Sequence, residues 1–183
     1  MTGPLEETNK SYAVAKIAGI VMCQGYNTQY GTNFISVMPT NLYGPRDNFD
    51  PLRSHVIPAL LRKFHEAKKV GLDTVEIWGT GSARREFMHA DYAASACLFL
   101  MQNYDDGSLI NIGTGEDISI RDLTEEIKKI VEYKGDITWD ATKPDGMLKK
   151  LLDVTKLQNL GWRHTVPLRE GIASTYQWYK ERH

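Results

Sequence analysis

The sequence has no excess charge of either sign and no long apolar run. It contains 22 basic and 23 acidic residues, which give a formal net charge of −1. This balance argues against a nucleic-acid-binding arm or a polybasic membrane patch. No apolar stretch approaches the roughly 20 residues that a transmembrane helix needs, and the polar residues 1–10 do not form the pattern of a signal peptide. We therefore expect neither a nucleic-acid partner nor a membrane.

Cysteine is scarce as well. The two cysteines, Cys23 and Cys97, lie far apart in the sequence and within segments of helical pattern. Isolated thiols of this kind are typical of buried, reduced side chains in a cytoplasmic protein, so a cytoplasmic location is expected. A catalytic cysteine is the weaker alternative, because neither thiol has an obvious local partner. The sequence predicts no metal site.

What the sequence does contain is a regular alternation of helical and strand-like segments. Hydrophobic residues make up 42% of the chain, an ordinary share for a globular protein. Helices are predicted over residues 11–30, 54–69, 91–103, 119–133 and 168–182, and strands over 33–38, 74–78, 86–89, 109–112 and 136–140. This alternation predicts an α/β fold with parallel strands.

Several residues mark the boundaries of these elements. Gly31 is expected to end the first helix, and Pro39 the strand that follows it. Ser54 is the candidate N-cap of the second helix. Ser119 and Asp122 have the spacing of a capping box at the start of the fourth helix.

The pair Tyr12 and Lys16 is the most informative short motif. Positions four apart share one face of a helix, so a phenol and an ammonium there can meet the same ligand. A free tyrosine has a pKa near ~10 and is a poor acid or base at neutral pH, but a nearby cation favours the phenolate. Tyr12 could then exchange a proton with a carbonyl or alcohol oxygen. The same spacing also occurs by chance in many helices, and that reading stays open on the motif alone.

Longer stretches give the pair its context. They are SYAVAKIAGI (11–20), SVMPTNLYGPRDNFDP (36–51), SHVIPALLRKFHEA (54–67), EIWGTGSARREFMHADYAA (76–94), INIGTGEDISI (110–120), TKPDGMLKKLLDVTKL (142–157), LGW (160–162) and ASTYQWY (173–179). In order and length they resemble the extended short-chain dehydrogenase/reductase family, and within it the GDP-L-fucose synthases. SHVIPALLRKFHEA and KPDGMLKKLLD are the segments that indicate fucose synthase, since other sugar-nucleotide epimerases share much of the rest.

The resemblance implies a fold, a reaction and a cofactor. The fold would be the C-terminal part of a Rossmann-type NADP-binding fold plus a smaller α/β substrate-binding domain. Residues of about 1–45 and 86–115 would form the first part, interleaved with a second part of about 46–85 and 116–183. The family converts GDP-4-keto-6-deoxy-D-mannose to GDP-L-fucose by two epimerisations beside a ketone and a reduction of that ketone with NADPH.

Individual residues match the family's reaction centre and cofactor site. Tyr12 matches the catalytic tyrosine, and Lys16 the lysine that binds NADP and tunes that tyrosine. His55 matches the acid/base of the epimerisation, which also contacts the cofactor, and its side chain has a reference pKa suited to that task. The loop expected around the nicotinamide consists of Pro39, Thr40, Asn41 and Leu42.

Four further residues match positions that hold the GDP-sugar: Lys63, Trp78, Arg85 and Asp145. Lys63 replaces an arginine of the bacterial pattern, which keeps the charge but loses the planar fork of two donors. Taken alone, each has a plainer interpretation. His55 could only help to cap a helix, Trp78 could be a core residue, Arg85 could belong to a solvated charge cluster, and Asp145 could only shape a turn.

The glycine-rich phosphate loop of such a reductase has no match in this sequence. Residues 79–81 and 113–115 both read Gly-Thr-Gly, but each lacks the third glycine of the dinucleotide-binding motif and is better interpreted as a turn. In the family that motif, a catalytic serine and a cysteine precede the tyrosine helix, so the resemblance implies that they lie outside this chain.

This arrangement has consequences for partners and for function. The strand 33–38 would have an unpaired edge, and the tyrosine helix would expose an apolar face. We expect a homodimer, or another association that covers these surfaces. Three functions stay open: an NADP-dependent epimerase/reductase, a non-catalytic GDP-sugar-binding fragment, and another sugar-nucleotide epimerase of the same superfamily.

Overall fold

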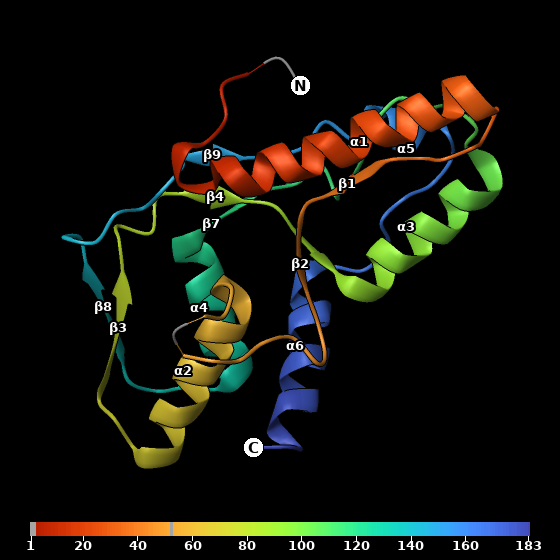
Figure 1. Ribbon diagram of the computed structural model, residues 1–183. Coiled ribbons are helices and arrows are strands. Elements are labelled where there is room, and N and C mark those ends of the chain that lie inside the picture. Colours follow the sequence, from red (N-terminus) through yellow and green to blue (C-terminus); the bar gives the residue numbers. More distant parts are fainter. Residues whose placement is uncertain (1–2, 52) are drawn as a thin grey trace.

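The computed structural model describes residues 3–51 and 53–183. The helical segments are η1 (Glu7–Asn9), α1 (Lys10–Tyr30), α2 (Val56–Val70), α3 (Ala90–Asn103), α4 (Ile120–Val131), α5 (Thr155–Asn159) and α6 (Leu168–Lys180). The strands are β1 (Val37–Pro39), β2 (Asn41–Tyr43), β3 (Thr74–Trp78), β4 (Arg84–Arg85), β5 (Phe87–His89), β6 (Ile110–Ile112), β7 (Ile118–Ser119), β8 (Asp136–Asp140) and β9 (Lys149–Lys150). Figure 1 shows α1 along one side of the molecule, with α2, α4 and α6 grouped away from it.

The strands pair mostly in parallel, which confirms the predicted α/β class. The parallel pairs are β1 with β6, β2 with β5, and β3 with β8. The short strand β4 lies between β7, which is antiparallel to it, and β9, which is parallel. Parallel pairs need crossover connections, and helices supply them here, as in other α/β proteins.

One residue separates β1 from β2 and redirects the chain between two partners. The backbone N–H of Thr40 donates to the carbonyl of Ile112 at 2.9 Å, and its hydroxyl donates to the carbonyl of Glu86 at 3.1 Å. The chain therefore leaves β6 and joins β5 within a single residue. Pro39 is the last residue of β1 rather than the residue that ends it, because a proline is tolerated where a strand has a free edge.

Two clusters of buried side chains hold the fold together. The larger gathers side chains of α2, α4 and α6 against β3, with Phe64, Leu61, Leu123, Ile127 and Ile172 fully buried. The smaller joins α3 to β6, with Met88, Leu100, Ile110 and Ile112 at its centre. Leu157 and Trp162 pack into this smaller cluster, so residues from the end of the chain return to it.

The observed ends of the helices can be compared with the predicted cap residues. Gly31 ends α1 in the left-handed conformation, with φ of 63°, where a side chain would be strained. The Ser119 hydroxyl accepts from the backbone N–H of Asp122 at 3.0 Å and donates to its carboxylate at 2.6 Å, so the predicted cap is confirmed. The expected cap at Ser54 is wrong: α2 begins after His55, with no side-chain cap.

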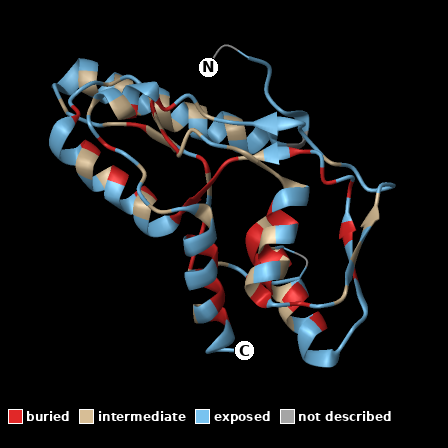
Figure 2. Cartoon of the chain, turned by 180° about the vertical axis from the view of Figure 1, so that it is seen from behind, coloured by how far each residue is buried: buried red, intermediate tan, exposed pale blue. Residues whose placement is uncertain are grey.

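Helix α1 is the least enclosed element. None of its residues, all of which are described, is buried, and Figure 2 shows it coloured exposed or intermediate throughout. Its exposed apolar side chains include Tyr12, Val14, Val21, Met22, Tyr26 and Tyr30. This confirms the apolar surface expected for the tyrosine helix. Cys23 and Cys97 are free and lie on α1 and α3, as predicted, but both are half-buried rather than buried.

Candidate functional site

A pocket of about 690 Å³ opens where the end of β2, the start of α2 and the strand β4 meet. Its walls are formed by segments 41–47 and 54–58 together with Arg85, Phe87, Ala90, Ile120 and Asp145. Five of the predicted site residues line it, namely Asn41, Leu42, His55, Arg85 and Asp145. They come from four separate segments of the sequence, so only the tertiary structure brings them together.

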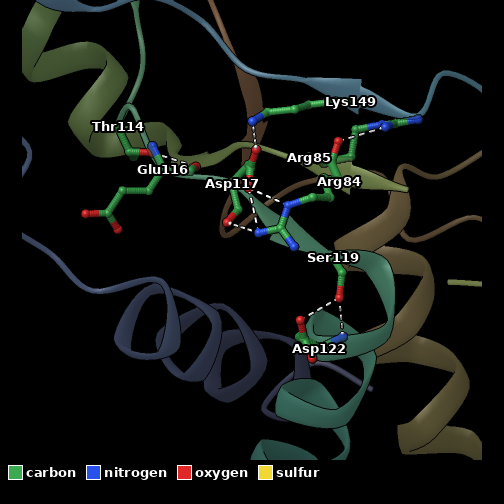
Figure 3. Close-up of polar contacts among 8 residues, drawn as sticks. All are labelled: Arg84, Arg85, Thr114, Glu116, Asp117, Ser119, Asp122 and Lys149. Carbon is green, nitrogen blue, oxygen red and sulfur yellow. Dashed lines mark hydrogen bonds and ion pairs between the residues drawn. The ribbon is translucent and has the colours of Figure 1, made fainter. Parts of the chain in front are cut away.

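Arg85 supplies positive charge to this pocket. It follows Arg84 in β4, and successive side chains of a strand point to opposite faces. Arg84 points to Asp117, with Nε 2.6 Å from Oδ1, and Lys149 lies 3.1 Å from the other oxygen (Figure 3). The bond from Arg84, with Lys149 as a further cause, lowers the pKa of the Asp117 carboxyl.

The Arg85 side chain points away from that ion pair, as Figure 3 shows. Its Nη1 donates to the carbonyl of Arg84 at 2.8 Å. No carboxylate in the described ranges 3–51 and 53–183 forms an ion pair with it. Arg85 therefore presents an uncompensated guanidinium to the pocket, which suits an anionic ligand.

Asp145 lines the same pocket, but its carboxylate is turned to the loop that connects β3 to β4. Oδ1 accepts from the backbone N–H of Thr80 at 2.8 Å, and Oδ2 accepts from the Thr80 hydroxyl at 2.6 Å. The Ser82 hydroxyl lies 3.5 Å from Oδ2. These hydrogen bonds, those from Thr80 first, lower the pKa of the Asp145 carboxyl.

His55 stands at the N-terminus of α2, at the edge of the pocket. It is the exposed residue before the helix, and its side chain makes no capping bond. The plainer reading as a cap therefore does not hold. Beside it, the Ser54 hydroxyl is buried and has no hydrogen-bond partner among the described residues. An imidazole that is not engaged in capping is available to a ligand.

Tyr12 and Lys16 lie outside the pocket lining, on α1. The Lys16 ammonium is 5.4 Å from the centroid of the Tyr12 ring. The Tyr12 side chain is 65% exposed, so the pair shares one open helix face as predicted. Of the neighbouring loop residues, Pro39 is exposed and Thr40 is buried.

Lys63 and Trp78 also lie outside the pocket lining. The Lys63 ammonium donates to the carbonyl of Glu76 at 2.7 Å, which ties α2 to β3. Trp78 ends β3 and is 67% exposed, with the Lys143 ammonium 5.6 Å from its ring centroid. The alternative that Trp78 is a core residue is therefore wrong, and an exposed aromatic face beside a cation remains.

Two buried residues that are sequence neighbours of the pocket-lining residues were not predicted. Glu86 has no exposed surface. Its Oε1 accepts from the backbone N–H groups of Thr114 and Gly115 at 2.6 and 2.9 Å, and its Oε2 accepts from that of Leu152 at 3.0 Å. A Cβ at Gly113 would collide with this carboxylate. The only sequence signal was the Gly-Thr-Gly turn itself.

His89 is the second such residue. Its Nδ1 accepts from the backbone N–H of Asp91 at 3.3 Å, so its Nε2 carries the hydrogen. That nitrogen is buried and has no partner among the described residues. It lies behind Gly44, where an added Cβ would approach it to 3.3 Å. Nothing in the sequence distinguished this histidine from an ordinary strand residue.

Two features are absent from the described part of the chain. Within residues 3–51 and 53–183, no helix has the length and apolarity to cross a membrane. The same residues hold no cluster of three or more His, Cys, Asp or Glu side chains that could bind a metal ion.

The chain is similar to known proteins over its whole length. It is 53% identical over 181 residues to a probable GDP-L-fucose synthase 1 of Oryza sativa subsp. japonica, covering 99% of this chain and 55% of that protein. It is 53% identical over 190 residues to a GDP-L-fucose synthase of Escherichia coli (strain K12), covering 99% and 59%. The chain therefore spans somewhat more than half the length of these relatives.

The solved structures and the family profile agree with this. A GDP-L-fucose synthetase of Naegleria fowleri bound to NADP superposes with a TM-score of 0.92 at 32% identity, covering 98% of this chain and 58% of that one. The profile of the NAD dependent epimerase/dehydratase family matches residues 1–113. The chain belongs to the NAD dependent epimerase/dehydratase family.

Proposed function

We propose that this chain carries the substrate side of a GDP-L-fucose synthase, an NADP-dependent enzyme that converts GDP-4-keto-6-deoxy-D-mannose to GDP-L-fucose. The observation that carries the proposal is the pocket in which His55, Arg85 and Asp145 converge. Arg85 offers an unpaired guanidinium to the diphosphate, and His55 offers an acid/base next to it. The two relatives of 53% identity bear the name of this activity.

The chemistry follows from the ketone of the substrate. A ketone acidifies the C–H bonds on both flanking carbons, so epimerisation needs a group that removes a proton on one face and a second group that returns a proton on the opposite face. His55 is the proposed base, since imidazole exchanges protons near neutral pH. Tyr12 stabilises the enolate oxygen by hydrogen bonding and then gives its proton to that oxygen as the alcohol forms. The Lys16 ammonium favours the phenolate that remains after this transfer.

The residues of the chain fit part of NADP. Tyr12 and Lys16 form an open pair with the two groups 5.4 Å apart, which suits the ribose and nicotinamide end, and NADPH when bound supplies the hydride that reduces the ketone. Asn41 and Leu42 at the pocket wall are the proposed neighbours of the nicotinamide, with Pro39 and Thr40 beside them. The sequence holds no glycine-rich pyrophosphate loop, so no residue here is assigned to that group.

Substrate contacts, assembly and location complete the proposal. Lys63 and Trp78 are proposed to contact the GDP portion, together with Arg85 and Asp145. Self-association through the exposed apolar face of α1 would cover Val21, Met22 and their neighbours, which supports a homodimer. The two free thiols support a cytoplasmic location.

A second candidate is a GDP-sugar-binding chain without catalytic activity of its own. It is favoured by the position of Tyr12, which does not line the pocket that contains His55. Titration calorimetry with GDP and fluorescence titration with NADPH separate the two. The enzyme proposal expects the purified chain to bind both ligands. GDP binding without NADPH binding would support the second candidate for the chain by itself.

The GDP titration also tests the pocket. Arg85→Met keeps the bulk of the side chain and removes its charge, so GDP affinity should fall roughly 10- to 100-fold, the loss expected for one charged hydrogen bond. Arg169→Met is the matched control, because Arg169 pairs with Glu126 at 3.0 Å outside the pocket. Equal affinity in the Arg85 variant and the unsubstituted chain would contradict the proposed site.

A further inference from the structure

Asp145 reaches the pocket from a loop that is otherwise open to solvent. Residues 141–148, here called the flap, connect β8 to β9. Every flap residue except Asp145 is exposed, including Met147 at 52% and Leu148 at 72%. A segment with so little buried surface has no packing of its own to hold it in one place.

Backbone hydrogen bonds hold the two ends of the flap, whereas its middle is held by the side chain of Asp145. At one end the backbone N–H of Lys143 donates to the carbonyl of Asp140 at 3.2 Å, and at the other the Leu148 carbonyl accepts from the backbone N–H of Arg84 at 2.8 Å. Between them, the bonds from Thr80 and Ser82 to the Asp145 carboxylate cross from the β3–β4 connection to the flap.

The β3–β4 connection is shaped to receive this carboxylate. Gly79 has φ of 85°, and a Cβ there would collide with Asp145 Oδ1. Gly81 has φ of 77°, and the Arg121 guanidinium donates to the carbonyl of Thr80 at 2.5 Å, which fixes the turn. The first Gly-Thr-Gly motif of the sequence thus binds a side chain of its own protein.

The flap also lies close to Arg85. Gly146, next to Asp145, has φ of 70°, and a Cβ added to it would lie 3.6 Å from Arg85 Nη2. The flap therefore passes directly beside the guanidinium at the pocket wall. Asp145 and Arg85 both line the pocket, but among the ion pairs of the described residues none joins them.

We infer that Asp145 is a positioning residue. Its hydrogen bonds with Thr80 and Ser82 hold the flap beside Arg85. The same bonds keep the Asp145 carboxylate away from the Arg85 guanidinium. The inference rests on the proposed function for its ligand, a nucleoside diphosphate. It assigns Thr80 a part in ligand binding although Thr80 does not line the pocket.

A double-mutant cycle on GDP affinity tests this assignment. Thr80→Val removes the hydroxyl and Asp145→Ala removes the carboxylate, and each should weaken GDP binding, by roughly fivefold for Thr80→Val, a loss of the size measured between coupled neighbours. The double variant should bind no more weakly than Asp145→Ala, because both changes break one contact. Thr142→Val is the matched control: its hydroxyl donates to Asp140, the last residue of β8, at 2.5 Å and does not contact Asp145, so the GDP affinity of this variant should stay unchanged.

Three outcomes of these GDP titrations would contradict the inference. If Asp145 acts only by touching the ligand, Asp145→Ala weakens binding while Thr80→Val does not, and the inference is overturned. Additive losses in the double variant overturn it as well. If the unsubstituted chain binds no GDP, the proposed function fails and no ligand remains for Asp145 to position.

Hydrogen exchange tests the hydrogen bonds between Thr80 and Asp145 without any ligand present. In Asp145→Ala the backbone amide of Thr80 loses its acceptor, so its exchange should accelerate without any GDP present, and the flap amides should follow. Unchanged exchange at Thr80 would contradict the claim that Asp145 holds the flap through Thr80, whatever the GDP titration gives. Faster exchange with unchanged GDP affinity would leave Asp145 a purely structural role and overturn the positioning.

Discussion

The carboxylate of Glu86 accepts a hydrogen bond from the backbone N–H of Thr114 at 2.6 Å, inside a Gly-Thr-Gly turn. Backbone N–H groups of such a turn form an anion-binding concavity. Here the anion is an internal side chain with no exposed surface. The same residue's carbonyl accepts from Asn41 Nδ2 at 2.7 Å, so Glu86 joins the turn to the pocket wall.

Replacing that carboxylate should destabilise the fold. Glu86→Gln removes the charge and leaves an N–H₂ group facing one of the backbone donors, so we expect a loss of roughly 1.5–3 kcal/mol in the free energy of unfolding. Urea unfolding followed by circular dichroism measures it. Glu125→Gln, at an exposed position of α4, makes the same chemical change as a control. Equal stability of the two variants would contradict the central role of Glu86.

Tyr12→Phe tests the proposed proton donor. The variant keeps the ring near the Lys16 ammonium but removes the hydroxyl, so reduction of the keto-sugar with NADPH should fall by about 10²–10⁴-fold, the usual contribution of a positioned acid. GDP affinity should be retained, because Tyr12 lies outside the pocket lining. Tyr26→Phe, which removes a phenol hydroxyl elsewhere on α1, serves as the control. Unchanged turnover in Tyr12→Phe would rule out its proposed role.

His55→Ala tests the proposed base without depending on the reduction. Proton exchange beside a ketone needs an acid/base but no hydride, so deuterium from the solvent should enter the two flanking carbons more slowly in this variant. The effect on exchange should exceed the effect on reduction. His164→Ala, whose ring contacts Tyr92 and not the pocket, should exchange like the unsubstituted chain. Rapid deuterium incorporation in His55→Ala would exclude the histidine as the base.

The pH dependence of stability provides a test at another place. Burial beside Tyr176, with the charge of Lys69 as the second cause, lowers the pKa of His65. Below the usual histidine pKa of about 6.5, the unfolded chain therefore binds this proton more readily than the folded protein does. Stability from this group is present above that pH and is lost as the pH falls through the lowered value.

His65→Gln should remove this contribution. Between pH 7.5 and 5, the free energy of unfolding of the variant should decrease less than that of the unsubstituted chain, as urea titrations at each pH can measure. An NMR titration of the His65 ring should give a midpoint below the usual histidine pKa of about 6.5. A midpoint at or above about 6.5 would contradict the effect assigned to burial.

Much of the fold was accessible from local signals. Gly31, the capping pair Ser119 and Asp122, and the strands 74–78 and 136–140 were placed as the structure has them. These features depend on residues close in sequence, so propensity and spacing are sufficient. Ser54 is not the cap, because the chain continues for one more residue and α2 begins after His55.

By itself, the sequence determined the α/β class, the Tyr12–Lys16 pair on one helix face and the family, because each of these depends on residues that are close together in the chain. Only the tertiary structure decided what the two Gly-Thr-Gly turns do. One binds the carboxylate of Asp145 across 65 residues, and the other binds that of Glu86 across 28. Their partners are distant in the chain, so no local pattern could name them. The same holds for Arg85, whose free guanidinium depends on Arg84 pairing with Asp117 on the opposite face of β4.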